Sequence, residues 1–475
     1  MVRVRADRPR RARGHVLDLD HVHPAISTSY ASHVTYASPM RSPYHRPGRV
    51  LAAGRRRTVL LLAATLLALV LTVYGSGAQQ AEPPAASSLP PAGVLAATSS
   101  SAPVEPASDP SPSQAPPPDV HLTIGYAGDV LPHMPVMDDT PGGQGDISGM
   151  IAGEQPWVAG VDLALCGMEV PIAPDGVASG YPMFGTLPPV VQALRGSGWD
   201  GCATASNHAY DQGLAGVVAT ADTLVANGMG FAGTNRSQAE AATPYQLYRL
   251  EREGRTVTVA QLSSTYSLNG LVDETGWAVQ INSVEWAAAQ ARAARDAGAD
   301  VVVLHSQIGE EYTRDPVQSQ TDYANAIAAT GEIDVLFSAH PHVPQTNELL
   351  PGGPGGRGMW VSYSAGNYLS NQSEAQGTVM ACIGVFVWVD VTVTAQGQVS
   401  VDALHWHPFT VDLDGGHRVL DLAALARGEV PAGTTLSAEE IAYRWQTVTE
   451  IMNPQTYSDT VPAPTGSEPT VVPRS

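Results

Sequence analysis

Carboxylate, amide and imidazole side chains directly follow several apolar segments in the middle of this 475-residue sequence. Carboxylate and amide oxygens combined with imidazole nitrogens form a mixed donor set that suits Mn, Fe or Zn. A structural zinc site would typically include thiolates. The pattern therefore indicates a chemically active metal centre, and its candidate ligands are Asp129, Glu169, Asn207, His305, His340 and His342.

Each candidate ligand stands at or just beyond the end of a predicted strand. Runs of β-branched and apolar residues predict strands over His121–Ala127, Val161–Leu165, Gly201–Ala205, Thr256–Leu262, Asp300–Leu304, Ile333–Ser338 and Met359–Tyr363. Helices are predicted between them over Pro189–Arg195, Gly213–Ala226, Val284–Ala297 and Gln318–Thr330. This alternation predicts an α/β fold, in which ligand-binding loops meet beyond the carboxyl ends of the strands. Two later runs, Met380–Val393 and Val399–Asp412, predict a second sheet packed on the first.

Five short motifs occur in a specific order along this region. Together they resemble the motifs of the CapA family of capsule, or poly-γ-glutamate, synthesis proteins, a branch of the calcineurin-like metallophosphoesterases. The resemblance runs from Gly128 to about Gln372 and implies a four-layer α/β/β/α sandwich of metallophosphoesterase type. The motifs are Gly128-Asp129, Met168-Glu169-Val170-Pro171, Ala205 to Gly213 (ASNHAYDQG), Ala339-His340-Pro341-His342-Val343 and Tyr363 to Tyr368 (YSAGNY).

The resemblance also assigns roles to the candidate residues. It implies a site for two divalent metal ions, which can activate a water and hold phosphoryl oxygens during in-line attack. His208 would remain free to act on substrate, Asp211 would orient its ring, and Asn367 would contact substrate. The implied ligands are Asp129 and His342 for the first ion, Asn207, His305 and His340 for the second, and Glu169 as a bridge between them.

Two departures from the family pattern concern the surroundings of these ligands. Gly167-Met168 precedes Glu169, where the family usually has an Asn before a Leu-Glu pair. The usual His-Trp-Gly-x-Glu-Tyr segment appears as His305 to Tyr312 (HSQIGEEY), with two more residues between His and Gly. The pocket wall that the family's tryptophan would form is therefore expected to differ in this chain. The acidic pair Glu310-Glu311 is predicted to lie on a solvated face.

The segments outside the CapA-like domain, predicted over residues 119–412, differ from it in composition. Residues 1–57 form a basic segment, and residues 1–39 are hypothesised to be untranslated because Met40 would give a shorter leader. Residues 58–78 contain the apolar run Val59–Tyr74 after three arginines, which predicts a signal peptide or a signal anchor. Residues 79–118 form a Pro/Ala/Ser-rich linker, and residues 413–475 are predicted to be an extension with one helix and a disordered tail from Asn453.

Charge and cysteine content narrow the function further. Beyond residue 57 the chain has 13 Arg, no Lys and 42 acidic residues, a formal charge of −29. Such an acidic body argues against nucleic acid as a partner, because that binding depends on Lys and Arg. The three cysteines, Cys166, Cys202 and Cys382, show no CxxC spacing and are predicted to be buried apolar residues rather than a disulfide framework.

Three functions are consistent with these observations. The first is an exported CapA-like protein, secreted or held at the membrane as a single-pass protein, that acts in synthesis or anchoring of a surface polymer. Its partners would be an anionic polymer or phosphoester substrate and the membrane proteins of polymer synthesis. The second is a general exported phosphatase or nucleotidase. The third is a non-catalytic scaffold of a polymer-synthesis complex.

Overall fold

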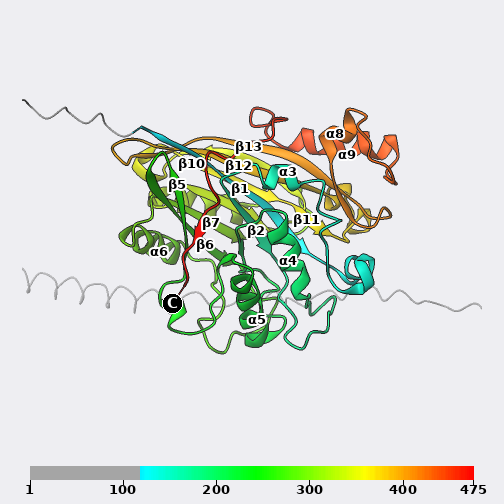
Figure 1. Ribbon diagram of the computed structural model, residues 1–475, viewed down its shortest axis with the longest axis horizontal. Coiled ribbons are helices and arrows are strands. Elements are labelled where there is room, and N and C mark those ends of the chain that lie inside the picture. Colours follow the sequence, from blue (N-terminus) through cyan, green and yellow to red (C-terminus); the bar gives the residue numbers. More distant parts are fainter. Residues whose placement is uncertain (1–117, 475) are drawn as a thin grey trace, which may run out of the picture. The chain divides into compact units, whose positions relative to one another are not determined.

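The computed structural model describes residues 118–474, so the basic segment, the apolar run Val59–Tyr74 and the linker lie outside the described residues. The described part contains two β-sheets (Figure 1). The first sheet has the strand order β14-β13-β12-β1-β2-β3-β4, with β11 also paired to β1, and the second has the order β15-β5-β6-β7-β8-β10-β9. Parallel pairs such as β1–β2, β2–β3, β6–β7 and β7–β8 form the centre of each sheet.

The bounds of the elements follow the predicted alternation of strands and helices closely. The strands are β1 Val120–Leu131, β2 Leu163–Met168, β3 Gly201–Ala203, β4 Gly230–Ala232, β5 Gln246–Arg252, β6 Arg255–Thr265, β7 Val301–Gln307, β8 Val335–Ala339, β9 Pro344–Leu350, β10 Met359–Ala365, β11 Asn367–Ser370, β12 Ile383–Val393, β13 Val399–Asp412, β14 Arg418–Asp421 and β15 Thr470–Val471. The α-helices are α2 Met134–Asp139, α3 Gln155–Val158, α4 Pro188–Gly196, α5 Gly213–Ala226, α6 Val284–Asp296, α7 Gln318–Thr330, α8 Leu422–Ala426 and α9 Ala438–Ile451.

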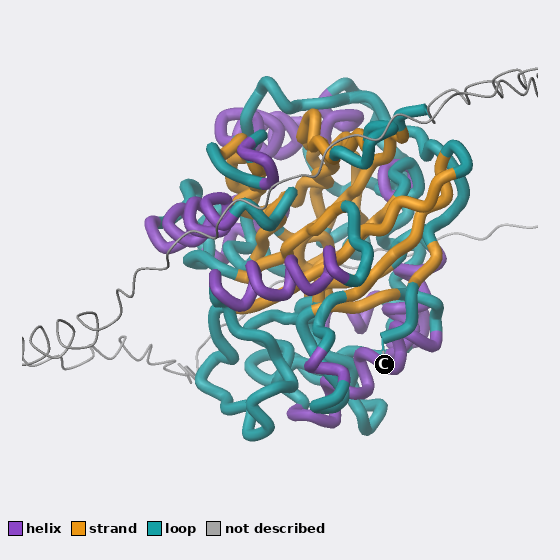
Figure 2. The backbone as a smooth tube through the Cα atoms, turned by 90° about the vertical axis from the view of Figure 1, so that its left-hand side faces the viewer, coloured by secondary structure: helices purple, strands orange, loops and turns teal. Residues whose placement is uncertain are grey.

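Three apolar clusters arrange these elements in four layers. One cluster lies between the sheets and joins side chains of β1, β2 and β12 to those of β5, β6, β7 and β8. A second cluster joins the outer face of the first sheet to α4 and α5, and a third joins the outer face of the second sheet to α6 and α7. Figure 2 shows helices on the outside of the strands, as this arrangement requires. The fold is therefore an α/β/β/α sandwich, as the sequence predicted.

The late strands extend the first sheet rather than forming the second. β12 pairs with β1 along Val120 to Tyr126, and β13 pairs with β12. The second sheet is instead built from β5 to β10, and its inner face is covered by the first sheet. The prediction erred because strand pairing between segments far apart in the chain leaves no local signal in the sequence.

The C-terminal segment is an ordered part of the sandwich, which differs from the predicted extension and disordered tail. β13 and β14 form an antiparallel pair across the predicted boundary at residue 412. Beyond α9, β15 pairs with β5, and Arg474 donates to the Asn235 side chain and lies over the Phe231 ring. The polar composition of the tail suggested disorder, but its backbone and its arginine find partners on the sheet edge.

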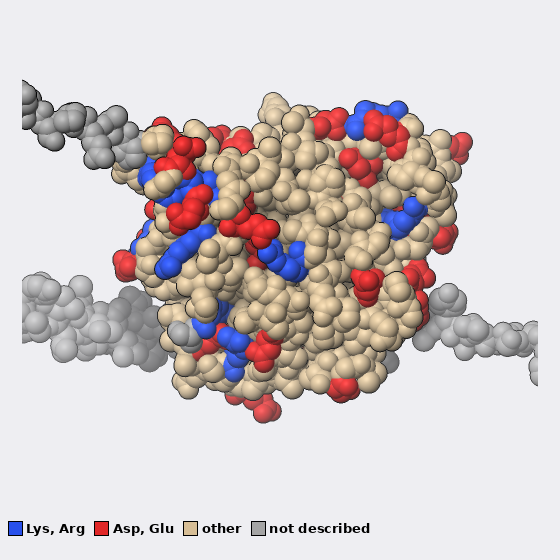
Figure 3. Space-filling model, in the orientation of Figure 1, with Lys and Arg blue, Asp and Glu red and all other residues tan. Residues whose placement is uncertain are grey.

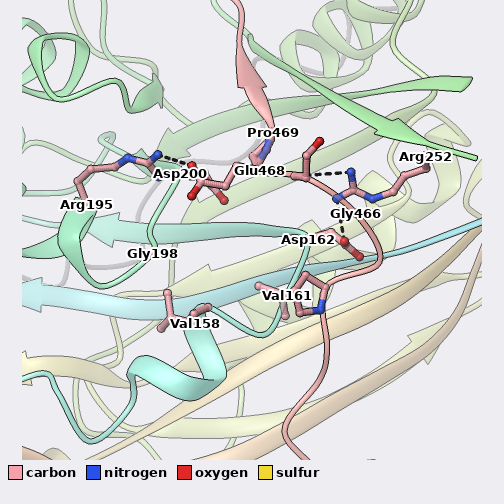
Figure 4. Close-up of a pocket in the computed structure, with 13 residues that line it drawn as sticks. Val158, Val161, Asp162, Arg195, Gly198, Asp200, Arg252, Gly466, Glu468 and Pro469 are labelled. Atoms are coloured by element: carbon pink, nitrogen blue, oxygen red, sulfur yellow. Dashed lines mark hydrogen bonds and ion pairs between the residues drawn. The ribbon is translucent and has the colours of Figure 1, made fainter. Parts of the chain in front are cut away.

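Residues 464–469 close a cavity of about 250 Å³ at the amino-terminal ends of β2 and β3 (Figure 4). Its wall contains the buried ion pair of Asp162 with Arg252, at 2.7 Å, and the pair of Arg195 with Asp200, at 3.3 Å. Glu468 also reaches Arg195 from the C-terminal segment. The ion pair of Glu468 with Arg195 therefore joins the C-terminal segment to α4 beside this cavity.

Most arginines within residues 118–474 pair with an acidic side chain at short range, although acidic residues greatly outnumber arginines. On the face drawn in Figure 3, most basic side chains lie beside acidic ones, and much of the surface between them carries no charge. Surface pairs of this kind include Arg236 with Asp222 and Arg427 with Asp459. Within residues 118–474, no helix combines the length and the apolar character that a membrane crossing requires.

Cys166 and Cys202 form a disulfide bond, which differs from the prediction of unpaired buried cysteines. The two residues are direct register partners on the parallel strands β2 and β3, with a Cα–Cα distance of 4.4 Å. The two cysteines are 36 residues apart in the sequence and match no recognisable cysteine motif. Their pairing depends on the register of the two strands, which the sequence does not show. Cys382 is buried and free.

This pairing predicts the thiol content of the purified protein. In denaturant without reductant, a thiol reagent is expected to detect one thiol per chain, from Cys382, and three after reduction. A Cys382→Ser variant should show none before reduction and two after it. Three reactive thiols in the unreduced protein would contradict the bond.

Candidate metal centre

The carboxyl ends of the central strands of both sheets meet at one edge of the sandwich. Asp129 lies near the end of β1, Glu169 directly follows β2, and His342 lies in the loop after β8. Ligand atoms of these three residues all lie within 4.8 Å of one another, and all three side chains are buried. His342 Nδ1 is 3.2 Å from Asp129 Oδ2, and His342 Nε2 is 3.7 Å from Glu169 Oε1. The two sheets thus contribute to one buried donor group.

The backbone around Asp129 requires a glycine beside it. The Asp129 N–H donates to the Gly366 carbonyl at 3.0 Å, where β1 changes register between its neighbours β2 and β11. A Cβ atom on Gly128 would overlap the Gly366 carbonyl oxygen, at 2.0 Å. The Gly-Asp pair of the sequence motif is therefore explained by this close contact, which turns the carboxylate toward the second sheet.

Several polar atoms in this region are buried without a hydrogen-bond partner in the protein. They are both carboxylate oxygens of Glu169, Oδ1 of Asn207, Nδ1 of His340 and Oε1 of Gln307. Leaving a buried polar atom unsatisfied costs about 1–3 kcal/mol, so such a group normally has an additional partner. Divalent cations would satisfy the carboxylate, amide and imidazole donors together. The residues present thus fit a metal centre of mixed oxygen and nitrogen donors.

His340 and His342 adopt unusual backbone conformations. Their φ angles are 102° and 59°, in the left-handed region that residues other than glycine rarely occupy. Their rings are 6.0 Å apart, and ligand atoms of His340, His342 and Glu311 lie within 4.8 Å of one another. Backbone strain of this kind concentrates at functional sites, where surrounding structure maintains it. The loop after β8 is therefore shaped to bring both imidazoles to the edge.

His208 stands beside the centre with its ring held by a carboxylate. His208 Nδ1 is 2.7 Å from Asp211 Oδ2, and the same oxygen accepts the Phe184 N–H at 2.8 Å. Burial by itself would lower the pKa of His208, but the Asp211 hydrogen bond and the Glu169 charge outweigh it and raise that pKa. Asn269 lies within 3.5 Å of both His208 and the Asn207 amide. The arrangement can hold a proton on His208 next to the metal donors.

The structure places His305 apart from the donor group. Its ring packs against Tyr126, at 4.8 Å between centroids, and against Phe337, at 5.7 Å, in the layer between the sheets. Burial lowers its pKa to about 3, and neither ring nitrogen has a partner. From the same strand, β7, Gln307 Nε2 instead donates to Asp129 Oδ1 at 2.6 Å. Gln307 was not among the predicted ligands.

Asn367 differs from its predicted role in substrate contact. Its side chain is buried, its Oδ1 is 3.1 Å from His342 Nδ1, and its amide donates to the carbonyls of His342 and Ala381. The amide also donates to Gln372 Oε1. With its polar atoms used within the protein, Asn367 orients the His342 ring rather than a substrate.

Two residues of the site were missed in the sequence. Glu311 was assigned to a solvated face, and it is exposed, yet it approaches His340 and His342. The left-handed Tyr312 that follows it donates its N–H to the Pro341 carbonyl at 2.8 Å, which ties the β7 loop to the histidine loop. Gln307 could have been suspected from its position two residues after His305, since both face the same side of a strand.

Metal affinity is expected to rise with pH. Burial and the Asp129 charge raise the pKa of Glu169 to about 8. Burial would lower the pKa of His342, but Glu169 and Asp129 outweigh it and raise that pKa to about 9. A cation needs both groups deprotonated, so binding displaces protons and should tighten by up to about tenfold per pH unit for each displaced proton, up to about pH 9. Calorimetric titrations in buffers of different ionisation enthalpy count these protons, and an affinity unchanged between about pH 6 and pH 8 would contradict the prediction.

The two-sheet sandwich with this donor group at the carboxyl ends of its strands defines a protein of the metallophosphoesterase fold class. The sequence model of the family "Bacterial capsule synthesis protein PGA_cap" matches residues 123–372, more than half of the chain. The chain therefore belongs to this family of capsule synthesis proteins, as the motif resemblance to CapA proteins predicted.

Several known proteins are similar to part of this chain in sequence or in structure. The PGA biosynthesis protein CapA of Bacillus subtilis (strain 168) is 26% identical over 188 residues, which is 38% of this chain and 45% of that protein. The chain thus matches less than half the length of that relative. Among solved structures, the NAD nucleotidase of Haemophilus influenzae aligns with a TM-score of 0.40 and 13% identity, over 72% of this chain and 64% of that one. The calcineurin-like phosphoesterase YfkN of Bacillus subtilis aligns with a TM-score of 0.37 and 16% identity, over 70% and 98%.

Proposed function

We propose that this protein is an exported hydrolase of phosphoester bonds that uses two divalent metal ions and acts in synthesis or anchoring of a capsule-type surface polymer. The observation that supports it most is the buried group of Asp129, Glu169 and His342, in which both carboxylate oxygens of Glu169 lack a hydrogen-bond partner. Family membership supplies the connection to capsule synthesis. Mn, Fe and Zn all suit this donor set.

Each residue has a defined task in this proposal. When bound, two divalent cations would lower the pKa of an attacking water and neutralise phosphoryl oxygens. Glu169, Asp129 and His342 would hold the ions, and the negative charge of Glu169 would offset the repulsion between two cations. His208, whose ring Asp211 holds, would donate to a phosphoryl oxygen or protonate the leaving group.

Export is part of the proposal. The apolar run Val59–Tyr74 after three arginines supports it, because signal peptides and signal anchors share this pattern. The disulfide between Cys166 and Cys202 supports it as well, since disulfides persist in oxidising compartments outside the cytoplasm. We propose secretion or attachment to the cell membrane through the apolar run.

A second candidate is a phosphatase or nucleotidase for small substrates that carry a ring. Exposed tyrosines line the approach to the centre: the Tyr266 ring is 4.5 Å from the His340 ring, and Tyr181 packs near Phe184, which contacts His208. Aromatic faces of this kind stack well on planar groups. The acidic body also disfavours a long polyanion along the domain surface.

The test combines metal analysis with hydrolysis assays on the purified full-length protein. p-Nitrophenyl phosphate and bis(p-nitrophenyl) phosphate report on monoester and diester cleavage, and a nucleoside monophosphate reports on the second candidate. His208→Ala is expected to lower turnover by about 10²–10⁴-fold while metal content stays unchanged. Protein that holds no metal and hydrolyses no probe would support the scaffold function instead.

A further inference from the structure

We infer that Gln307, and not His305, is the residue of β7 that completes the metal centre, through its side-chain carbonyl oxygen Oε1. The inference rests on the proposed metal site and adds a ligand to it. An amide oxygen in this place would also bias the centre toward a hard, oxygen-preferring cation such as Mn²⁺ over Zn²⁺.

The first support is the contact of Gln307 with Asp129. Gln307 Nε2 donates to Asp129 Oδ1 at 2.6 Å, while Asp129 Oδ2 lies 3.2 Å from His342 Nδ1. A carboxylate can only accept, so the NH₂ end of the amide must face Asp129. This fixes the Gln307 side chain at the donor group and leaves its other polar atom, Oε1, next to that group.

The second support is that Oε1 has no partner. Gln307 is only 6% exposed, and its Oε1 is buried without a hydrogen bond. Glu169, Asn207 and His340, all candidate ligands, also have buried atoms without a hydrogen-bond partner, and so does His305. Of the two β7 residues in this condition, it is Gln307 that contacts Asp129. A bound cation would satisfy the Gln307 oxygen, whereas no protein group does so.

The third support is the backbone that positions Gln307. It is the last residue of β7, paired with Thr265 of β6 and Ala339 of β8, and His340 follows directly after Ala339. The Gln307 carbonyl accepts the Tyr266 N–H at 3.0 Å and the Asn282 side chain at 3.1 Å. His305 lies two residues earlier on the same face of the strand, which places its ring deeper between the sheets, against Tyr126 and Phe337.

The test measures metal affinity, with no reliance on activity. Full-length protein stripped of metal with a chelator is titrated calorimetrically with Mn²⁺ and, separately, with Zn²⁺. Gln307→Met, which removes the oxygen and keeps the volume, is expected to weaken Mn²⁺ binding tenfold or more. Gln307→His, which offers an imidazole nitrogen instead, is expected to raise the ratio of Zn²⁺ to Mn²⁺ affinity tenfold or more.

His305→Leu is the matched control, because it changes the same face of the same strand two residues away. Its affinities and stoichiometry should equal those of the unchanged protein. Circular dichroism checks the fold of each variant, and if Gln307→Met fails to fold, the affinity ratio of Gln307→His still decides.

Three outcomes would overturn the inference. An unchanged affinity ratio in Gln307→His would mean that Gln307 only donates a hydrogen bond to Asp129. Loss of an ion in His305→Leu would assign the role to His305. Absence of metal binding in the unchanged protein would contradict both the proposed function and the inference. Metal binding that is unaffected by substitution of Gln307 would contradict the inference alone.

Discussion

Replacing Glu169 by glutamine is expected to abolish metal binding and hydrolysis together. Glu169 is completely buried, and both of its carboxylate oxygens lack protein partners. The substitution keeps the shape of the side chain but removes the negative charge that offsets repulsion between two cations. We expect turnover of p-nitrophenyl phosphate to fall by at least about 10³-fold, equivalent to about 4 kcal/mol of lost transition-state stabilisation.

Glu154→Gln provides a matched control for this prediction. Glu154 is likewise buried, has an unpartnered Oε2 and has a pKa raised well above its usual value by burial, but it precedes α3 and contributes to no metal-type donor group. This variant should keep its metal content and activity. Metal content measured by elemental analysis after gel filtration gives the readout. A Glu169→Gln protein with full metal content and unchanged turnover would refute the assigned site.

Replacing Asp162 by alanine is expected to cause the largest loss of stability among the substitutions considered. Asp162 Oδ1 accepts from Arg252 Nη2 at 2.7 Å (Figure 4). The same oxygen accepts the Thr465 N–H at 2.6 Å, and Oδ2 accepts the Thr123 N–H at 2.8 Å. The side chains of Asp162 and Arg252 are 0% and 2% exposed. Because removing one partner of a buried ion pair leaves an uncompensated charge, Asp162→Ala is expected to cost about 3–5 kcal/mol.

The control for this prediction comes from the same cavity. Glu468 pairs with Arg195, but its side chain is 78% exposed, so Glu468→Ala should cost less than about 1 kcal/mol. Denaturant unfolding measures both, as a shift of the midpoint at constant slope. Equal losses in the two variants would show that the Asp162 pair does not join β1, β5 and the C-terminal segment as described.

The fold could be predicted to a large extent because its central strands are nearly continuous apolar runs. The predicted strand Asp300–Leu304 overlaps β7, and the predicted strand Ile333–Ser338 overlaps β8. The four predicted helices correspond to α4, α5, α6 and α7. What failed was sheet membership: β12 and β13 join the first sheet. Pairing partners are chosen by contacts between distant segments, and the local composition of a strand does not encode them.

The candidate site was predictable in its chemistry but not in every residue. Asp129, Glu169 and His342 come together as one donor group, and His208 lies beside Asp211. Asp129 lies near the end of β1, Glu169 directly follows β2, and His208 and His342 lie in the loops after β3 and β8. The carboxyl ends of parallel strands meet at one edge of an α/β sheet, so these residues come together there. His305 and Gln307 share a face of β7, and only the position of the strand end relative to Asp129 shows which of them reaches the edge.

The sequence by itself indicated an α/β fold, the donor chemistry and the family, because apolar periodicity and ordered motifs are local properties of the chain. The four-layer sandwich was implied by the resemblance to the family. Tertiary structure alone decided which cysteines pair, where the polar C-terminal segment binds, and which side chain of β7 contacts Asp129. Each of these depends on register and on contacts between segments far apart in the chain. Such contacts form only when distant segments pair within a sheet or pack between sheets, so no single stretch of residues determines them.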